Sequence, residues 1–334
     1  MKTIELSTIA QALLHLIRIH LWGETADTSL MGKLTDEDWK ALYALACEHD
    51  VVAEAYEGLR SLPDHLLPSQ AVLQNWRTVA QEAENQSDKK RQVLDELRQQ
   101  CADQHLPQPV VLGGVDRKAI DLWFPGYDLE ADYLFSKMEL SMNYDNPDYT
   151  TVLWQGVELR NHYSLQDQTL LDIWRAEGDS PLFQMLYNLR QIISGLRERF
   201  TLRQVIRWAL LLHDCQGHYD RDKMLSLLNH QHLLRAMGIL TFVAEQYLGL
   251  PHEAVLMNLR TYQEEGTRML AQAFCPKEHL QILSLCQACC LQFFLWLCPS
   301  YFLPTSVFIS RKSSIFAPSL RNNYGLATES IHTN

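Results

Sequence analysis

Hydrophobic side chains recur three and four positions apart along much of the chain, which is the spacing of helices that bury one face. The pattern is clear over residues 13–21 and again over residues 39–46. Residues 69–100 are polar with a thin apolar stripe, which predicts one or two long, solvent-exposed helices. Residues 1–104 are therefore predicted to form a helical N-terminal region.

The spacing changes at residue 105. Residues 107–114 are a short apolar run closed by Gly113 and Gly114, which predicts a buried strand entering a tight turn. Residues 115–123 can form a short helix. We expect a small α/β core over residues 105–165.

Two further strand signals fall inside this core. Residues 127–135 alternate charged and apolar side chains, which predicts a strand with its acids on one face. Residues 150–154 and 157–162 flank Gln155-Gly156 and predict a β-hairpin. The sheet is therefore expected to be small and mixed.

Helical spacing returns after the sheet. It predicts a helical C-terminal region over residues 166–300, followed by a weakly ordered tail over residues 301–334. The predicted fold class is α+β and mainly helical, with a small mixed sheet between two helical regions.

The net charge of the chain excludes some classes of binding partner. The 334 residues include 40 acids against 29 Lys and Arg, a formal charge of −11. This charge repels phosphate backbones and argues against broad nucleic-acid binding. The N-terminal stretch is an amphipathic helix pattern rather than a signal peptide, so a cytoplasmic protein with reduced cysteines is expected. The uncharged residues 282–298 are interpreted as a buried helix, with a tail anchor as the alternative.

The strongest candidate chemistry is nucleotidyl transfer. It needs a glycine turn whose N–H groups approach the phosphates, and carboxylates that hold two Mg²⁺ ions. Gly113 and Gly114 supply the turn, while Glu130, Asp132 and Glu158 supply carboxylates in the required order. The alternatives are a pair shifted to Asp128 and Glu130, or an ordinary solvated acidic strand face.

Other polar clusters favour structural interpretations. The tail thiols lack a second ligand pair at metal spacing, and the histidine clusters lack the further ligands that a metal-dependent phosphohydrolase needs. Cys286, Cys289 and Cys290 are interpreted as buried thiols, and His213, Asp214 and His218 as a polar helix end. His230 and His232, in a loop-like stretch, are interpreted as surface residues.

Several segments resemble the bacterial family of uncharacterised nucleotidyltransferases. Residues 13–23 (LLHLIRIHLWG) and 38–46 (DWKALYALA) are similar to its helical lead. Residues 202–212 (LRQVIRWALLL) and 247–251 (YLGLP) are similar to its helical C-terminal part. Between these parts, the family has a Lys-Gly turn, an Arg followed by Gly-Asp-x-Asp, and a later Gly-x-x-Val-Glu-x-His strand.

The resemblance implies roles for individual residues. Gly114 matches the glycine of the turn, and Gly113 stands at the lysine. Glu130 and Asp132 match the paired aspartates, and Glu158 the third carboxylate. Arg160 stands at the histidine.

The implied activity is Mg²⁺-dependent transfer of a nucleotidyl group from an NTP to an unknown hydroxyl acceptor. In that reaction Glu130, Asp132 and Glu158 are metal ligands. The alternative is a catalytically dead interaction module that keeps the fold for an unknown protein partner.

Overall fold

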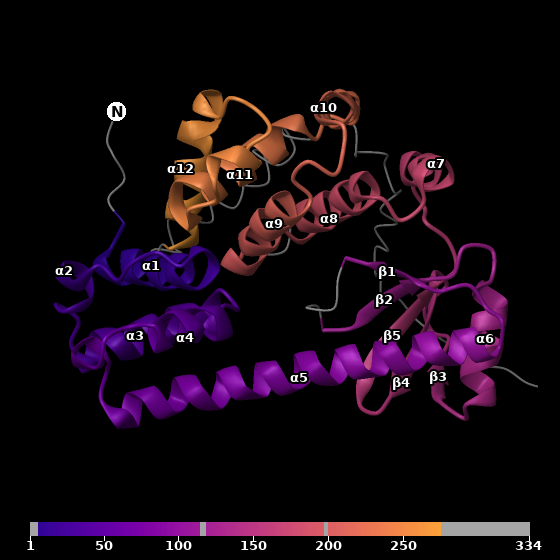
Figure 1. Ribbon diagram of the computed structural model, residues 1–334, viewed down its shortest axis with the longest axis horizontal. Coiled ribbons are helices and arrows are strands. Elements are labelled where there is room, and N and C mark those ends of the chain that lie inside the picture. Colours follow the sequence, from indigo (N-terminus) through magenta and orange to yellow (C-terminus); the bar gives the residue numbers. More distant parts are fainter. Residues whose placement is uncertain (1–5, 114–117, 197–199, 275–334) are drawn as a thin grey trace, which may run out of the picture. The chain divides into compact units, whose positions relative to one another are not determined.

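The computed structural model describes residues 6–113, 118–196 and 200–274 (Figure 1). Gly114, the uncharged run 282–298 and the predicted tail lie outside these residues. The N-terminal helices are α1 (Thr8–Trp22), α2 (Thr28–Met31), α3 (Asp36–Glu48), α4 (Val52–Arg60) and α5 (Gln70–Asp103). The sheet region comprises β1 (Val110–Leu112), β2 (Ile120–Trp123), α6 (Asp128–Lys137), β3 (Ser141–Asn143), β4 (Tyr149–Trp154) and β5 (Val157–His162). The later helices are α7 (Gln168–Glu177), α8 (Pro181–Leu196), α9 (Leu202–Asp214), α10 (Arg221–His230), α11 (Leu234–Leu248) and α12 (Gln263–Ala273).

Local sequence signals set the ends of the first helices. The Ser7 side chain accepts a hydrogen bond from the Ala10 N–H at the start of α1, and Gly23 ends that helix in the left-handed conformation. Thr35 and Asp38 form a capping box at the start of α3. These caps satisfy backbone groups that the helices themselves leave unpaired.

The five strands form one mixed sheet in the order β1-β2-β5-β4-β3. β2 and β5 are parallel, and the other neighbouring pairs are antiparallel. Gln155 and Gly156 both have positive φ between β4 and β5, as a type I′ hairpin turn requires. The predicted hairpin and the α+β, mainly helical fold class are confirmed.

Two local predictions are wrong. Residues 127–135 were expected to be a strand, but they lie mostly in helix α6, which buries Ala131, Leu134 and Phe135 at helical spacing. Residues 115–123 were expected to be a helix, but β2 begins at Ile120 and is buried along its length. The structure does not describe residues 114–117.

Helix α5 belongs to two hydrophobic cores. Its first half contributes Val72, Leu73, Trp76 and Ala80 to the core that the N- and C-terminal helices share. Its second half contributes Val93, Leu94, Leu97 and Cys101 to a second core beneath one face of the sheet. No residue from 81 to 92 is buried. The helix is therefore held at both ends and is polar in between.

The other face of the sheet is divided. At the β1 edge, Val110, Leu112 and Trp123 join the first core. Trp123 packs edge-on against Trp174 of α7, with 5.0 Å between ring centroids. Further along the same face, on β5, the side chains become polar. Among the described residues, no helix is long and apolar enough to cross a membrane.

Candidate functional site

Four polar side chains lie on the sheet face opposite the second core. Along β5, half-buried Glu158, Arg160 and His162 alternate with buried residues. Asp121 of β2 lies directly beside Arg160 in the parallel ladder, so it shares their face. The group is called the β2–β5 polar face below.

These side chains contact one another closely. Asp121 Oδ1 lies 2.9 Å from His162 Nε2 and 4.0 Å from Arg160 Nη1. Arg160 Nη2 lies 2.7 Å from Glu158 Oε1, and Arg160 Nε donates to the same oxygen at 2.8 Å. The Asp121 side chain is only 7% exposed, against 41% for Glu158. The guanidinium thus lies between a buried and a half-exposed carboxylate.

The surroundings of Arg160 favour its charged form. Partial burial lowers the pKa of Arg160, but the hydrogen bond to Glu158 and the negative charges of Glu158 and Asp121 outweigh burial and raise the pKa overall. Its guanidinium carbon also lies 5.5 Å from the centre of the Tyr149 ring. Arg160 is therefore a fixed positive charge on this face.

The glycine turn lies at the end of β1. Gly113 has a φ of +76°, a conformation that favours glycine. Its carbonyl accepts a hydrogen bond from Arg207 Nη2 of α9, and the carbonyl of Val111 accepts one from Gln184 Nε2 of α8 at 3.3 Å. The C-terminal helices therefore position the turn that sequence analysis assigned to phosphate binding.

Glu130 and Asp132 lie on α6 instead of on a strand. Glu130 is exposed. Asp132 accepts hydrogen bonds from Thr150 Oγ1 at 2.8 Å and from Asn161 Nδ2 at 2.9 Å. Asn161 and Glu158 are three residues apart on β5, so their side chains lie on opposite faces of the sheet. Asp132 therefore contacts the face away from Glu158. The structure does not bring Glu130 and Asp132 together with Glu158.

Asp121 is not among the site residues predicted from the sequence. A weak signal was present, because an Arg followed by Gly-Asp-x-Asp can be aligned with Arg117-Lys118-Ala119-Ile120-Asp121, with lysine at the glycine and alanine at the first aspartate. This match was overlooked because residues 115–123 were interpreted as a helix. Extending the β2–β5 register by one pair places buried Ala119 beside Glu158. The position beside Glu158 on β2 therefore carries no carboxylate.

The residues present do not fit a two-metal site. In the part of the chain that the structure describes, no three His, Cys, Asp or Glu side chains form a group that could hold a metal ion. The two acids on the β2–β5 polar face already contact Arg160. A pair of Mg²⁺ ions needs several free carboxylate oxygens in near-octahedral geometry, and this face does not provide them.

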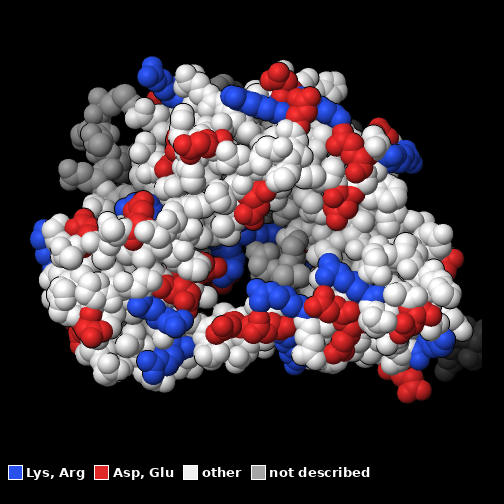
Figure 2. All heavy atoms as spheres, in the orientation of Figure 1, with Lys and Arg blue, Asp and Glu red and all other residues white. Residues whose placement is uncertain are grey.

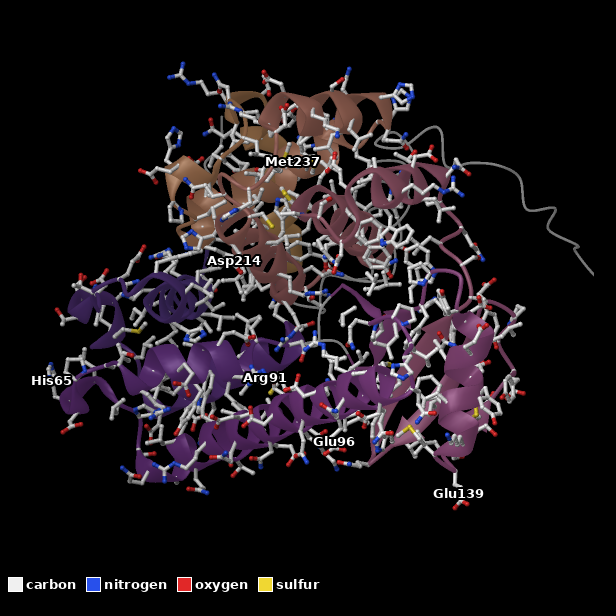
Figure 3. All side chains as sticks on the ribbon, turned by 45° about the vertical axis from the view of Figure 1, so that its right-hand side comes forward. His65, Arg91, Glu96, Glu139, Asp214 and Met237 are labelled. Atoms are coloured by element: carbon white, nitrogen blue, oxygen red, sulfur yellow. The ribbon has the colours of Figure 1, made fainter. Side chains whose placement is uncertain are left out.

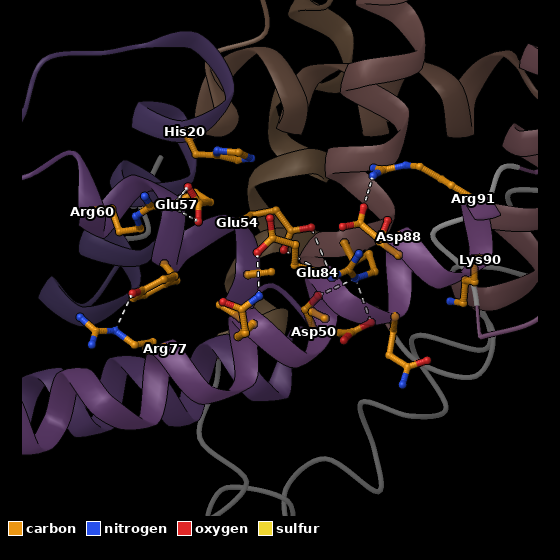
Figure 4. Close-up of a pocket in the computed structure, with 18 of the residues that line it drawn as sticks. His20, Asp50, Glu54, Glu57, Arg60, Arg77, Glu84, Asp88, Lys90 and Arg91 are labelled. Carbon is orange, nitrogen blue, oxygen red and sulfur yellow. Dashed lines mark hydrogen bonds and ion pairs between the residues drawn. The ribbon is translucent and has the colours of Figure 1, made fainter. Parts of the chain in front are cut away.

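A separate cleft of about 940 Å³ lies along the polar middle of α5 (Figure 4). Its charges are largely matched by ion pairs, at 3.0 Å for Arg60–Glu57, 2.7 Å for Arg91–Asp88 and 2.9 Å for Arg203–Asp50. Figure 2 likewise shows acidic and basic side chains interspersed on one face of the molecule. The cleft therefore lacks the single-sign lining that would select one class of ligand.

One residue of the histidine cluster near the end of α9, His213, has a structural role. Asp214 ends α9, as Figure 3 shows, within the helical part of the chain. The His213 ring packs edge-on against Trp22, with 5.2 Å between ring centroids. This packing agrees with the preferred interpretation of a polar helix end.

Comparison with known proteins bears on the N-terminal part and the turn. Residues 35–117 match the model of a family described as uncharacterised nucleotidyltransferase. Neither the curated proteins nor the solved structures include one that matches. The match runs from the capping box of α3 through α5 and β1 to the glycine turn, and it ends four residues before Asp121. Over residues 35–117, this chain is thus similar to the uncharacterised nucleotidyltransferase family.

Proposed function

We propose that the β2–β5 polar face and the Gly113 turn form the nucleotide-binding site of a nucleotidyltransferase-family protein that does not use two-metal transfer. The observation that carries the proposal is the position of Arg160. Its guanidinium contacts both Glu158 and Asp121, the two acids that share this face. An enzyme that relies on two Mg²⁺ ions needs those oxygens free.

The turn supports nucleotide binding. It follows a strand that is packed into the first core, and Arg207 fixes the carbonyl of Gly113. A glycine turn held in this way lets backbone N–H groups approach a phosphate closely without a side chain in between. Arg160 and His162 add donors on the neighbouring strand.

Thermal unfolding with each NTP tests this proposal. A nucleotide at ten times its dissociation constant stabilises the folded state by about 1.4 kcal/mol. We expect a rise in the unfolding midpoint for at least one NTP, and we expect it to persist in EDTA. Asp121→Asn should reduce the rise, whereas Glu130→Gln, on the exposed face of α6, should leave it unchanged. No rise with any NTP at millimolar concentration would contradict nucleotide binding and would favour the interaction module.

One contact favours a second candidate, an active transferase. Asp121 and His162 form a carboxylate–imidazole pair at 2.9 Å, which suits a general base. In that reaction the acceptor oxygen bonds to the α-phosphorus, the bond to pyrophosphate breaks, and His162 takes the hydroxyl proton. Pyrophosphate release that is lost in His162→Gln would establish this candidate. A stabilisation by NTP that requires Mg²⁺ would overturn the metal-independent site.

A further inference from the structure

We propose that the outer face of α6 binds a basic segment of another protein, through exposed tyrosines that acids surround. Helix α6 covers the face of the sheet away from Glu158, and Figure 1 shows it at the outer edge of the sheet region. The proposal therefore concerns a surface apart from the nucleotide site and does not depend on the proposed function.

Exposed apolar side chains are concentrated at α6. Six large hydrophobic side chains are exposed among the described residues, and four of them are Tyr127, Leu129, Tyr133 and Tyr144. Tyr127 is the N-cap of α6, and Leu129 and Tyr133 lie one turn apart on its outer face. Single exposed apolar side chains are normal, but a group of them indicates an interaction site. These four residues are called the α6 patch below.

Tyr144 belongs to the same surface. It directly follows β3, which packs against α6. Slight burial and the negative charge of Asp132 on α6, with a contribution from Tyr163, raise the pKa of Tyr144. The phenol therefore lies near the Asp132 carboxylate, and the α6 patch continues from the helix onto the loop after β3.

The acids around the α6 patch lack counter-charges. Residues 127–148 contain six acids and one base, Lys137, whereas the whole chain has 40 acids against 29 bases. Among the described residues, none of the six acids forms an ion pair, and Lys137 donates to the neutral amide of Gln104. Asp145 and Asp148 accept hydrogen bonds from neutral side-chain amides at 2.9 Å and 2.6 Å. In the cleft along α5, by contrast, arginines pair with most of the acids.

This combination selects the chemistry of the partner. Unpaired acids repel a second copy of the same surface, a nucleic acid and an anionic lipid. They attract arginine and lysine, and tyrosine rings also bind guanidinium groups through their faces. An apolar strip inside a charged rim is the usual arrangement of a protein–protein interface, in which tyrosine is enriched. A basic protein segment that carries apolar side chains fits both parts of this surface.

The test measures the binding of two fluorescent synthetic helices to the full chain by anisotropy. Both peptides carry leucines along one face, and the other face carries arginines in one peptide and glutamates in the second. We expect only the arginine peptide to bind. Leu129→Ser and Tyr133→Ser should each weaken its binding about fivefold or more, as the loss of an interface anchor does. Val79→Ser, at an exposed apolar position of α5, is the matched control and should bind as the wild type does.

A second pair of variants separates local charge from net charge. Glu130→Gln combined with Asp145→Asn should weaken binding of the arginine peptide several-fold and reduce its dependence on salt. Glu82→Gln combined with Asp222→Asn removes the same net charge from exposed positions on α5 and α10 and should have little effect. Circular dichroism establishes that each variant is folded.

Four results would overturn the proposal. The arginine peptide does not bind the wild type, or it binds no more tightly than the glutamate peptide. Both double variants weaken binding equally, since the peptide then responds only to net charge. Leu129→Ser and Tyr133→Ser bind as Val79→Ser does. Vesicles of phosphatidylcholine bind the wild type and not Leu129→Ser, which would assign the α6 patch to a membrane surface instead.

Discussion

Two acids on one helix have different surroundings. Asp132 and Glu130 are two residues apart on α6, so they point to different sides of that helix. Asp132 accepts hydrogen bonds from Thr150 and Asn161, both of which are fully buried. Glu130 is exposed to solvent. Asp132 therefore attaches α6 to the β4–β5 hairpin.

This difference predicts different effects on stability. Asp132→Ala should lower the free energy of unfolding by about 2 kcal/mol, because it leaves buried donors without their acceptor. Glu130→Gln should change it by less than about 0.5 kcal/mol, as is usual for an exposed position. Urea unfolding of the two variants measures both values. Equal losses would show that Asp132 has no special structural role.

Cysteine reactivity provides a second test at this scale. Burial raises the pKa of the Cys101 thiol to about 11, whereas Cys47 on α3 is exposed. Because the thiolate is the reactive form, iodoacetamide at pH 8 should label Cys47 in the folded protein and leave Cys101 unlabelled until urea is added. Peptide mass mapping distinguishes the two. Rapid labelling of Cys101 without denaturant would contradict its place in the second core.

At the scale of elements, long periodic segments were predictable and short apolar ones were not. The apolar stripe over residues 69–100 predicted a long helix, and Gln155-Gly156 predicted the hairpin. Residues 127–135 fit both the two-residue period of a strand and the 3.6-residue period of a helix, because Leu129 and Tyr133 continue the alternation of apolar and charged side chains. Those two side chains are 73% and 71% exposed, so burial of Ala131 and its helical neighbours decided the outcome.

The candidate site was predictable only in part. Glu158 and Gly113 could be found, since a hairpin strand and a glycine turn have local signals. Hydrophobic spacing did not indicate Asp121, because β2 has four buried residues and no alternation, and only the spacing of the family motif pointed to it. Its partner Arg160 lies 39 positions away, and only the parallel pairing of β2 with β5 brings them together. Non-local strand pairing is not readable from one sequence.

The junction of α1 and α2 predicts a dependence on pH. Burial and the nearby positive charge of Arg18 lower the pKa of His15 below 6.5, outweighing the opposing effects of Glu24 and Asp27. The N–H of Asp27 donates to His15 Nε2 at 2.8 Å, which requires that nitrogen to be unprotonated. Below pH 6.5 the unfolded chain takes up this proton first. The free energy of unfolding should therefore fall as the pH falls below 6.5, with no effect above it.

Urea unfolding at pH 7.5 and pH 5.5 measures this change. His15→Gln should reduce the difference between the two pH values. His65→Gln, at an exposed position, should leave it as in the wild type. An unchanged difference in His15→Gln would assign the pH dependence to other groups.

At the scale of the whole molecule, α5 joins the two cores. Its buried residues lie in the first and last parts of the helix, and the segment from 81 to 92 contributes to neither core. Such a segment owes its helical form to propensity and to side-chain pairs such as Gln81–Asn85 at 3.2 Å. Helix α5 therefore connects the two cores rigidly only while the segment from 81 to 92 stays helical.

Glycines at the centre of this segment test its contribution. With Asn85 and Gln86 both replaced by glycine, the protein should be about 2 kcal/mol less stable than with both replaced by alanine, at about 1 kcal/mol for each glycine relative to alanine. Alanines at the same positions should cost nothing. Hydrogen exchange should rise over residues 81–92 while the buried ends of α5 stay protected. Unchanged exchange would mean that this helix draws its stability from contacts outside itself.

The polar middle of α5 also has a consequence for how this chain can vary over evolution. Each residue added to a helix turns everything beyond it by about 100° and moves it by about 1.5 Å. One insertion between residues 81 and 92 would swing Val93 and Leu97 away from the sheet that they cover, although no buried side chain had changed. Among related chains, the residue types in this segment should therefore vary freely while its length stays constant. Surface loops, in contrast, also tolerate insertions and deletions.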